Sequence, residues 1–160
     1  MNTPATSEQK IPGALHGVRV LDLSQGIAGP FAARLLGDHD ADVIKIEPPH
    51  HGDAGRRLAQ SLLFQYLNWN KRSVALDLTT AFGQRTLRAL VEVSDILIES
   101  FRPGTLETWG ISVDTMLEWN PRLVVTSITN YGQTGPYARY EASDLTLQAM
   151  SGIMAISGQV

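Results

Sequence analysis

Short apolar runs rich in β-branched residues alternate along this chain with stretches of helical periodicity. Runs of this kind are typical of strands that are buried on both faces of a sheet. Because they alternate with helices, the sequence predicts βαβ units, a mostly parallel sheet and right-handed crossovers. The predicted fold class is therefore α/β with flanking helices. The predicted strands are Val18–Leu23, Val43–Ile46, Val74–Leu78, Ile96–Ile98 and Leu123–Ile128.

The helical segments lie between these runs and carry recognisable boundaries. Pro30 suits the first turn of a helix, and Ser112 or Asp114 suits the cap of another that ends at Asn120. The segment His50–Ser61 is polar and irregular, which predicts a long surface loop. The predicted helices are Phe31–Leu36, Leu62–Trp69, Thr80–Val93, Val113–Trp119 and Leu145–Met150.

Length and composition indicate one domain in a chain of 160 residues. We expect residues 1–15 to form a flexible tail and residues 16–160 to form the domain. The chain has 13 basic and 16 acidic residues without a basic stripe, so we expect no nucleic-acid partner. It has no run of the roughly 20 apolar residues that a membrane helix needs, so we expect no membrane partner.

The absence of cysteine excludes disulfides, a thiolate nucleophile and cysteine metal ligands. The four histidines are not at metal-ligand spacing, and we expect no metal site. The lack of cysteine and of an apolar leader is consistent with a cytoplasmic location.

The apolar segment Ser151–Val160 ends without a charged tail or another stop signal. Natural domains seldom expose such a run, so we expect a truncated or split chain. The alternative is that this end forms a helix that packs onto the sheet.

Ser24–Pro30 follows the first predicted strand and contains Gly26 and Gly29. Glycines let backbone amides approach a ligand, and a helix N-terminus follows, so the loop suits a phosphate or an adenine edge. It lacks the G-x-G-x-x-G pattern of dinucleotide sites. A plain β–α turn is the alternative.

Two further segments combine cations with strand ends. In Asn70–Ser73, Lys71 and Arg72 beside an asparagine can hold a phosphate, although a turn with structural salt bridges is the favoured interpretation of Arg72. In Ser100–Gly104, Phe101 can stack on adenine and Arg102 can meet a phosphate. Core packing of Phe101 remains equally open.

The loop Tyr131–Pro136 leaves the last predicted strand, and Asp144 follows it before an apolar helix. This carboxylate is a catalytic candidate, but an N-cap is the favoured interpretation. No G-x-S-x-G elbow is present, so a serine hydrolase is not indicated.

Taken in order, five motifs resemble those of the family III CoA-transferases (the CaiB/BaiF family), from about His16 to the last residue. The resemblance implies a Rossmann-like CoA-binding domain, the N-terminal part of that family's large domain. It also implies CoA and acyl-CoA as substrates, a carboxylic acid as acceptor, no prosthetic group, and interlocked homodimers. The motifs are VRVLDLSQGIAGP, NKRSVALDL, ESFRPG, SITNYGQTGP and DLTLQAMSG.

The resemblance implies CoA-binding positions, and the chain departs from the family at some of them. Some members carry Gln where Ile27 stands, most carry Asn where Ser100 stands, and many carry a phosphate-facing Arg where Thr108 stands. The residues implied to bind CoA are Gln25, Ile27, Ala28, Leu76, Ser100, Phe101 and Arg102.

In the family, an aspartate nucleophile attacks the acyl-CoA thioester and forms a mixed anhydride, and the transfer to the acceptor then passes through an aspartyl thioester. That aspartate matches a position beyond Val160, so we expect no catalytic residue in this chain and no activity from the chain alone. Two alternatives are a non-catalytic CoA-binding or assembly module and a relative of the α-methylacyl-CoA racemases. The racemases carry a histidine where this chain has Ser143.

Overall fold

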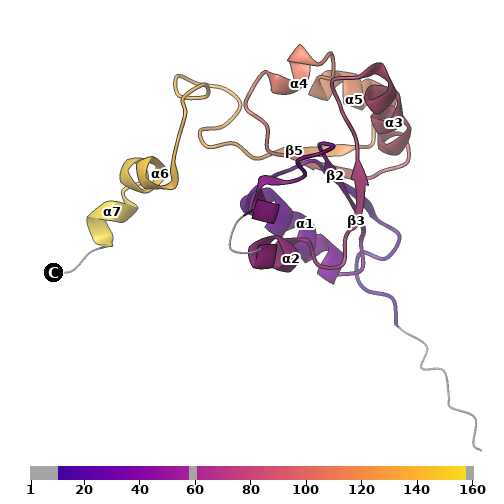
Figure 1. Ribbon diagram of the computed structural model, residues 1–160, viewed down its shortest axis with the longest axis horizontal. Helices are drawn as coiled ribbons and strands as arrows, with labels where there is room; N and C mark the ends of the chain where they lie inside the picture. Colours follow the sequence, from indigo (N-terminus) through magenta and orange to yellow (C-terminus); the bar gives the residue numbers. More distant parts are fainter. Residues whose placement is uncertain (1–10, 58–60, 158–160) are drawn as a thin grey trace, which may run out of the picture.

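The computed structural model describes residues 11–57 and 61–157, and its centre is a five-stranded parallel sheet in the order β3-β2-β1-β4-β5 (Figure 1). Every neighbouring pair of strands is parallel, as the alternating sequence pattern predicts. The strand order reverses direction at β1, so the neighbouring ends of β1 and β4 form the switch point where such sheets bind ligands. The strands are β1 Arg19–Asp22, β2 Asp42–Glu47, β3 Arg72–Ala75, β4 Ile96–Glu99 and β5 Val124–Ser127.

Successive side chains of the central strand β1 pack into two separate hydrophobic cores, one on each face of the sheet. Val20 packs with Ala33 of helix α1 (Ala28–Asp38) on one face of the sheet. Leu21 packs on the other face with Leu87 of helix α3 (Ala81–Val91). This alternation is the period-two geometry of a strand, and it explains why the buried strands read as continuous apolar runs.

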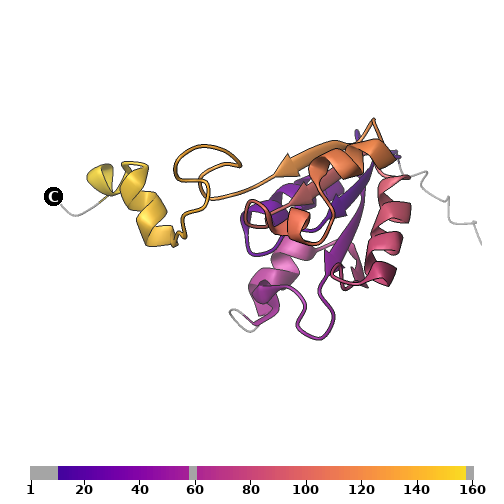
Figure 2. The same ribbon diagram turned by 90° about the horizontal axis from the view of Figure 1, so that it is seen from above.

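The remaining helices complete the two layers around the sheet (Figures 1 and 2). Helix α2 (Leu62–Asn68) and the 3₁₀ helix η1 (Ala54–Arg57) lie on the α1 side. The short helix α4 (Thr105–Thr108) and α5 (Val113–Trp119) contribute Leu106 and Met116 to the α3 side. Ser112 caps α5 by accepting a hydrogen bond from the Thr115 amide, which settles the choice between Ser112 and Asp114.

Several sequence-based boundaries change in the structure. Helix α1 begins at Ala28, because Pro30 needs no amide partner in the first turn and tolerates the helix starting before it. The helix α4 was not predicted, since four residues carry too little periodicity. The predicted tail lies mainly outside the described residues, but the Gly13 amide donates to Asp40 Oδ2 at 3.1 Å.

The segment predicted as a polar surface loop is partly buried. Asp53 is 1% exposed and Gly55 is buried in η1. The prediction was wrong here because it assumed that a polar segment stays in water, whereas buried partners neutralise these polar groups.

Helices α6 (Asp144–Met150) and α7 (Ile153–Ile156) project away from the sheet on an extended connection (Figures 1 and 2). The alternative in which the chain end packs onto the sheet is therefore wrong for the described residues up to 157. The two helices contact each other and have no buried residue of their own. None of the helices in the described ranges is both long and apolar enough to cross a bilayer.

Candidate functional site

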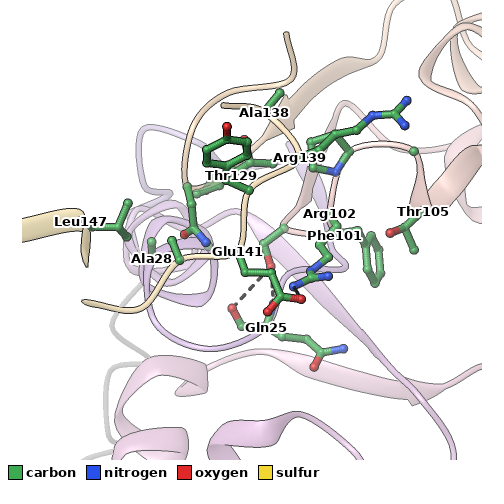
Figure 3. A pocket seen from close by; sticks show the side chains of 18 of the residues that line it. Gln25, Ala28, Phe101, Arg102, Thr105, Thr129, Ala138, Arg139, Glu141 and Leu147 are labelled. Carbon is green, nitrogen blue, oxygen red and sulfur yellow. Dashed lines mark hydrogen bonds and ion pairs between the residues drawn. The ribbon is translucent and has the colours of Figure 1, made fainter. Parts of the chain in front are cut away.

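A cleft of about 990 Å³ opens at the carboxyl ends of β1, β4 and β5 (Figure 3). One wall is the loop after β1, the floor and second wall are the loop after β4, and the segment after β5 crosses over both. The predicted CoA-binding residues on this cleft are Gln25, Ile27, Ala28, Ser100, Phe101 and Arg102.

The loop after β1 and the loop after β4 are joined by a hydrogen bond. The Gln25 amide donates to Ser100 Oγ at 2.9 Å, although the residues are far apart in sequence. Ala28 and Phe101 line the same cleft, so the two loops lie on the same edge of the sheet. Serine at position 100 therefore keeps a hydrogen-bonding function, and it is used within the protein.

The loop after β1 folds back tightly on itself. Helix α1 starts so close to the end of β1 that a Cβ on Gly29 would lie 2.2 Å from Ser24 Cβ. Gly26 has a φ of +79°, in the left-handed region that glycine adopts at no steric cost. The glycines of SQGIAGP thus permit a sharp turn that brings the α1 N-terminus to the cleft.

Phe101 fits both interpretations that the sequence left open, packing in the core and a position on the ligand cleft. Its ring packs edge-to-face on Trp109 at 5.2 Å between centroids and joins the core, yet it also lines the cleft. Its amide donates to Glu99 Oε2 at 2.7 Å, and Glu99 is buried. The ring is therefore held in place at the mouth of the cleft.

Leu76 lies outside the main cleft, in a neighbouring cavity of about 130 Å³. This smaller cavity shares Gln25 and Phe101 with the main cleft and is otherwise lined largely by apolar side chains. All the predicted CoA-binding residues therefore lie around two adjoining hollows.

Arg102 forms an ion pair with Glu141, with 2.7 Å between Nη2 and Oε1 (Figure 3). Both side chains are largely exposed, at 71% and 80%. The hydrogen bond and charge of Arg102 lower the pKa of Glu141 below its usual value. The sequence did not single out Glu141, because the pair forms only when the segment after β5 crosses the cleft.

Lys71, which the sequence suggested as a phosphate ligand, is instead buried and bonded to groups within the protein. Its ammonium donates to Asp22 Oδ2 at 2.7 Å and to the Pro30 carbonyl at 2.8 Å, with its side chain 1% exposed. Burial lowers the pKa of Lys71, and Asp22 opposes that effect. Arg72 forms salt bridges with Asp42, which confirms its structural interpretation.

Asp144 is not the N-cap that the sequence favoured. The cap is Ser143, which accepts from the Thr146 amide in a capping box, because the helix starts one residue earlier than predicted. The Asp144 carboxylate instead accepts from Gln148 Nε2 at 2.6 Å. Asp144 is not among the residues that line the cleft, and neither are residues 131–136. No cluster of potential metal ligands occurs within residues 11–57 and 61–157.

A parallel sheet with a large cleft at its switch point is typical of α/β proteins that bind nucleotides or cofactors. Comparison with family models narrows the class: the model of CoA-transferase family III matches residues 15–160, and the chain belongs to this family.

The chain is similar to characterised transferases over nearly its whole length. It is 44% identical over 150 residues to the succinyl-CoA–L-malate CoA-transferase β subunit of Chloroflexus aurantiacus, covering 90% of this chain and 37% of the relative. It is 40% identical over 158 residues to the acetyl-CoA:oxalate CoA-transferase of Acetobacter aceti, covering 96% and 41%. A CaiB/BaiF family protein from Brucella suis has the same fold, with a TM-score of 0.89, 35% identity, and coverage of 93% and 42%. The chain thus spans about two fifths of the length of these relatives.

Proposed function

We propose that the two adjoining hollows bind the CoA part of an acyl-CoA, in a protein that moves CoA from the acyl-CoA to a free carboxylic acid. The observation that carries the proposal is the hydrogen bond from the Gln25 amide to Ser100, which joins two loops of the family motif around one cleft. The activities for which the relatives are named, transfer of CoA between carboxylic acids, support the same reaction class.

The cleft residues offer complementary contacts to CoA. The Phe101 ring presents an apolar face to a base, and the Arg102 guanidinium can exchange Glu141 for a phosphate in two parallel hydrogen bonds. The apolar cavity beside Leu76 extends the base-binding surface. Thr108 also lines the cleft but carries no charge, so phosphate recognition rests on Arg102 and Arg139.

The proposed chemistry follows the family mechanism. An aspartate carboxylate attacks the thioester carbonyl, the CoA thiolate leaves, and a mixed anhydride forms. The CoA thiolate then attacks the aspartyl carbonyl of that anhydride and releases the acyl group as a carboxylate, giving an aspartyl thioester. The acceptor carboxylate attacks the carbonyl of this thioester, the CoA thiolate leaves, and a second mixed anhydride forms. The CoA thiolate finally attacks the acceptor's acyl carbonyl in that anhydride and frees the aspartate.

We propose that these 160 residues do not supply the nucleophilic aspartate. Among the residues that line the cleft, Glu141 is the acidic one, and it is paired with Arg102. Asp144 lies outside the cleft lining and binds Gln148. The isolated chain is therefore expected to bind CoA without transferring it.

Isothermal titration of the chain with CoA tests the binding site. Arg102→Gln should weaken binding by about 10-fold, the effect of losing one charge-assisted contact to a phosphate. Arg72→Gln is the matched control, because Arg72 begins β3 at the opposite edge of the sheet and pairs with Asp42. Equal affinities of the two variants, or no binding by the wild type, would contradict the proposal.

A transfer assay with several acyl-CoA donors and carboxylate acceptors tests the missing nucleophile. We expect no turnover. Turnover that disappears in Asp144→Ala but survives in Gln25→Ala would make Asp144 catalytic and overturn this part of the proposal. CoA binding without turnover in any longer protein that contains this chain would favour the non-catalytic module.

We further propose that α6 and α7 pack against more protein in an assembled enzyme, as the interlocked homodimers of the family imply. Their exposed apolar side chains support this assembly, because isolated apolar surface of this kind favours association. Light scattering of the assembled protein tests the dimer. The side chains concerned are Leu145, Met150, Ile153, Met154 and Ile156.

A further inference from the structure

Two lysine ammonium groups are buried directly beneath the loop after β1. Lys45 comes from β2 and Lys71 immediately precedes β3. Each side chain is 1% exposed, so neither faces the solvent of the cleft. A buried ammonium is costly unless every donor finds a partner, so their partners define their role.

Lys45 binds the start of the loop. Its Nζ donates to the Ser24 carbonyl at 2.8 Å. It lies 2.9 Å from Asp53 Oδ2 and 3.7 Å from Asp22 Oδ2, both buried. The contact with Asp53 is an ion pair rather than an aligned hydrogen bond, because Oδ2 has no hydrogen-bond partner among the described residues.

Lys71 binds the other end of the loop. Its Nζ donates to the Pro30 carbonyl at 2.8 Å, to Asp22 Oδ2 at 2.7 Å and to Asn68 Oδ1 at 2.9 Å. Its three donors are therefore used within the protein. Asp22 lies near both ammonium groups and links them at the base of the loop.

Asp53 adds a contact inside the loop itself. Its Oδ1 accepts from the Gly26 amide at 3.4 Å and from the Gly55 amide at 2.7 Å. The two lysines and two aspartates balance in charge, and together they hold the loop at its first residue, its last residue and one point between. An apolar filling would occupy the same space without fixing carbonyl positions, so the charged cluster specifies a loop shape.

We propose that Lys45 and Lys71, with Asp53, are positioning residues that fix the backbone of Ser24–Pro30 in the shape that binds CoA. This inference rests on the proposed CoA site, because it assigns these residues an effect on the ligand through the loop. None of the three lines the main cleft. They act on the amides of Gln25 and Gly26 and on the N-terminus of α1.

The experiment compares Asp53→Asn with Asp42→Asn in the 160-residue chain. Both replace one carboxylate by an amide of the same size. Asp42 begins β2 at the opposite edge and pairs with Arg19 and Arg72, whereas Asp53 follows the end of that strand beneath the loop. The readouts are CoA affinity by calorimetry, amide hydrogen exchange by NMR, and unfolding by urea.

Asp53→Asn should weaken CoA binding about 10-fold and speed exchange of the Gln25, Gly26 and Ala28 amides by a similar factor. The amides of β1 and β4 should change no more than in Asp42→Asn. This split separates positioning from general destabilisation, which would speed loop and sheet exchange alike. Unchanged loop exchange, or an equal rise in loop and sheet, would overturn the inference.

Asn68→Ala covers the case in which Asp53→Asn does not fold. It removes one acceptor of Lys71 without removing a charge, and it should weaken CoA binding about threefold with faster exchange around Gly29. Wild-type values of both quantities in Asn68→Ala would contradict the role of Lys71. If the wild type itself does not bind CoA, the proposed function fails, and loop exchange in the same variants still decides the positioning role.

Discussion

The two sides of the cleft are built in opposite ways. The loop Ser24–Pro30 rests on buried lysines and aspartates, and its turn is so tight that Gly29 leaves no room for a methyl group. The segment that ends in Glu141 is exposed, and a surface ion pair with Arg102 holds it at the cleft. Helix α6, which follows it, buries none of its residues.

The difference indicates a division of labour within one site. Regions with few buried contacts open at low free-energy cost, whereas a charged and buried cluster opens only with the surrounding core. We therefore expect the loop after β1 to supply a fixed template for the ligand. The segment after β5 is expected to move as the ligand enters.

The largest expected effect on stability comes from removing a buried charge beneath the loop Ser24–Pro30, the fixed side of the cleft. Lys71→Met leaves Asp22 buried with only the more distant Lys45 opposite, and this should lower the free energy of unfolding by about 3–5 kcal/mol. Urea unfolding measures the loss. Arg72→Met, at an exposed neighbouring cation, should cost no more than about 1 kcal/mol. A comparable loss in both variants would show that burial of the ammonium group does not matter.

Low pH should lower the folding stability on the same side of the cleft, because Glu47 becomes protonated. Burial raises the pKa of Glu47, but hydrogen bonds from Arg56, the Asp53 amide and Ser73 outweigh it and lower the pKa to about 2. Because the folded pKa is depressed, this stabilisation is present above pH 4.5, the unfolded value, and is lost as pH falls towards 2. The loss should be about 3 kcal/mol.

The measurement is urea unfolding between pH 6 and pH 2 for the wild type and Glu47→Gln. The variant has no carboxyl group to protonate at this position, so its stability should fall less steeply with acid. Parallel profiles for the two proteins would refute the assignment to Glu47.

Gly29→Ala should have the next largest effect on the fixed side. The added Cβ would overlap Ser24, and relieving the overlap should cost about 1–3 kcal/mol of stability and weaken CoA binding. Gly37→Ala in the same helix is the milder comparison, because its Cβ would lie 3.3 Å from Val43 Cγ2, a tight contact that a shift of a few tenths of an ångström relieves. Thermal unfolding and calorimetry of both variants test the difference. Equal behaviour would mean that the turn relaxes easily.

The smallest effect is expected in the segment after β5, the side of the cleft that we expect to move. Glu141→Gln should leave the unfolding transition unchanged, because both side chains of the ion pair with Arg102 are largely exposed to solvent. It should raise CoA affinity about threefold at low salt, since Arg102 no longer has to leave a charged partner, and the gain should shrink as salt is added. A drop in affinity would show that Glu141 helps to hold the ligand.

The sequence was sufficient for the parallel sheet and for the two loops, after β1 and after β4, that line part of the cleft. Short β-branched runs placed four of the five strands within one residue at each end, but β3 begins two residues and ends three residues earlier than predicted. Loops at the ends of β1 and β4 had to meet because parallel strands end at one edge. For Phe101 the sequence offered core packing and ligand contact as alternatives. It gave no sign that one ring serves both.

The errors that concern buried charged residues share a physical cause. The sequence presents Lys45 as an ordinary strand residue, Lys71 as a candidate phosphate ligand and Asp53 as part of a surface loop, yet all three side chains are buried. Their burial depends on partners far along the chain, and local hydrophobicity does not register such pairs. The start of α6 was misplaced for a local reason, since serine and aspartate in sequence both suit a cap.

The hydrogen bond between Gln25 and Ser100 has a consequence for folding during synthesis on the ribosome. It joins residues 75 positions apart. At about 5–20 residues per second, the ribosome finishes the first loop roughly 4–15 s before its partner exists. During that interval β1 has one open edge where β4 will later pair. An open edge invites pairing with other chains, so slow synthesis between residues 25 and 100 should favour aggregation of the nascent protein.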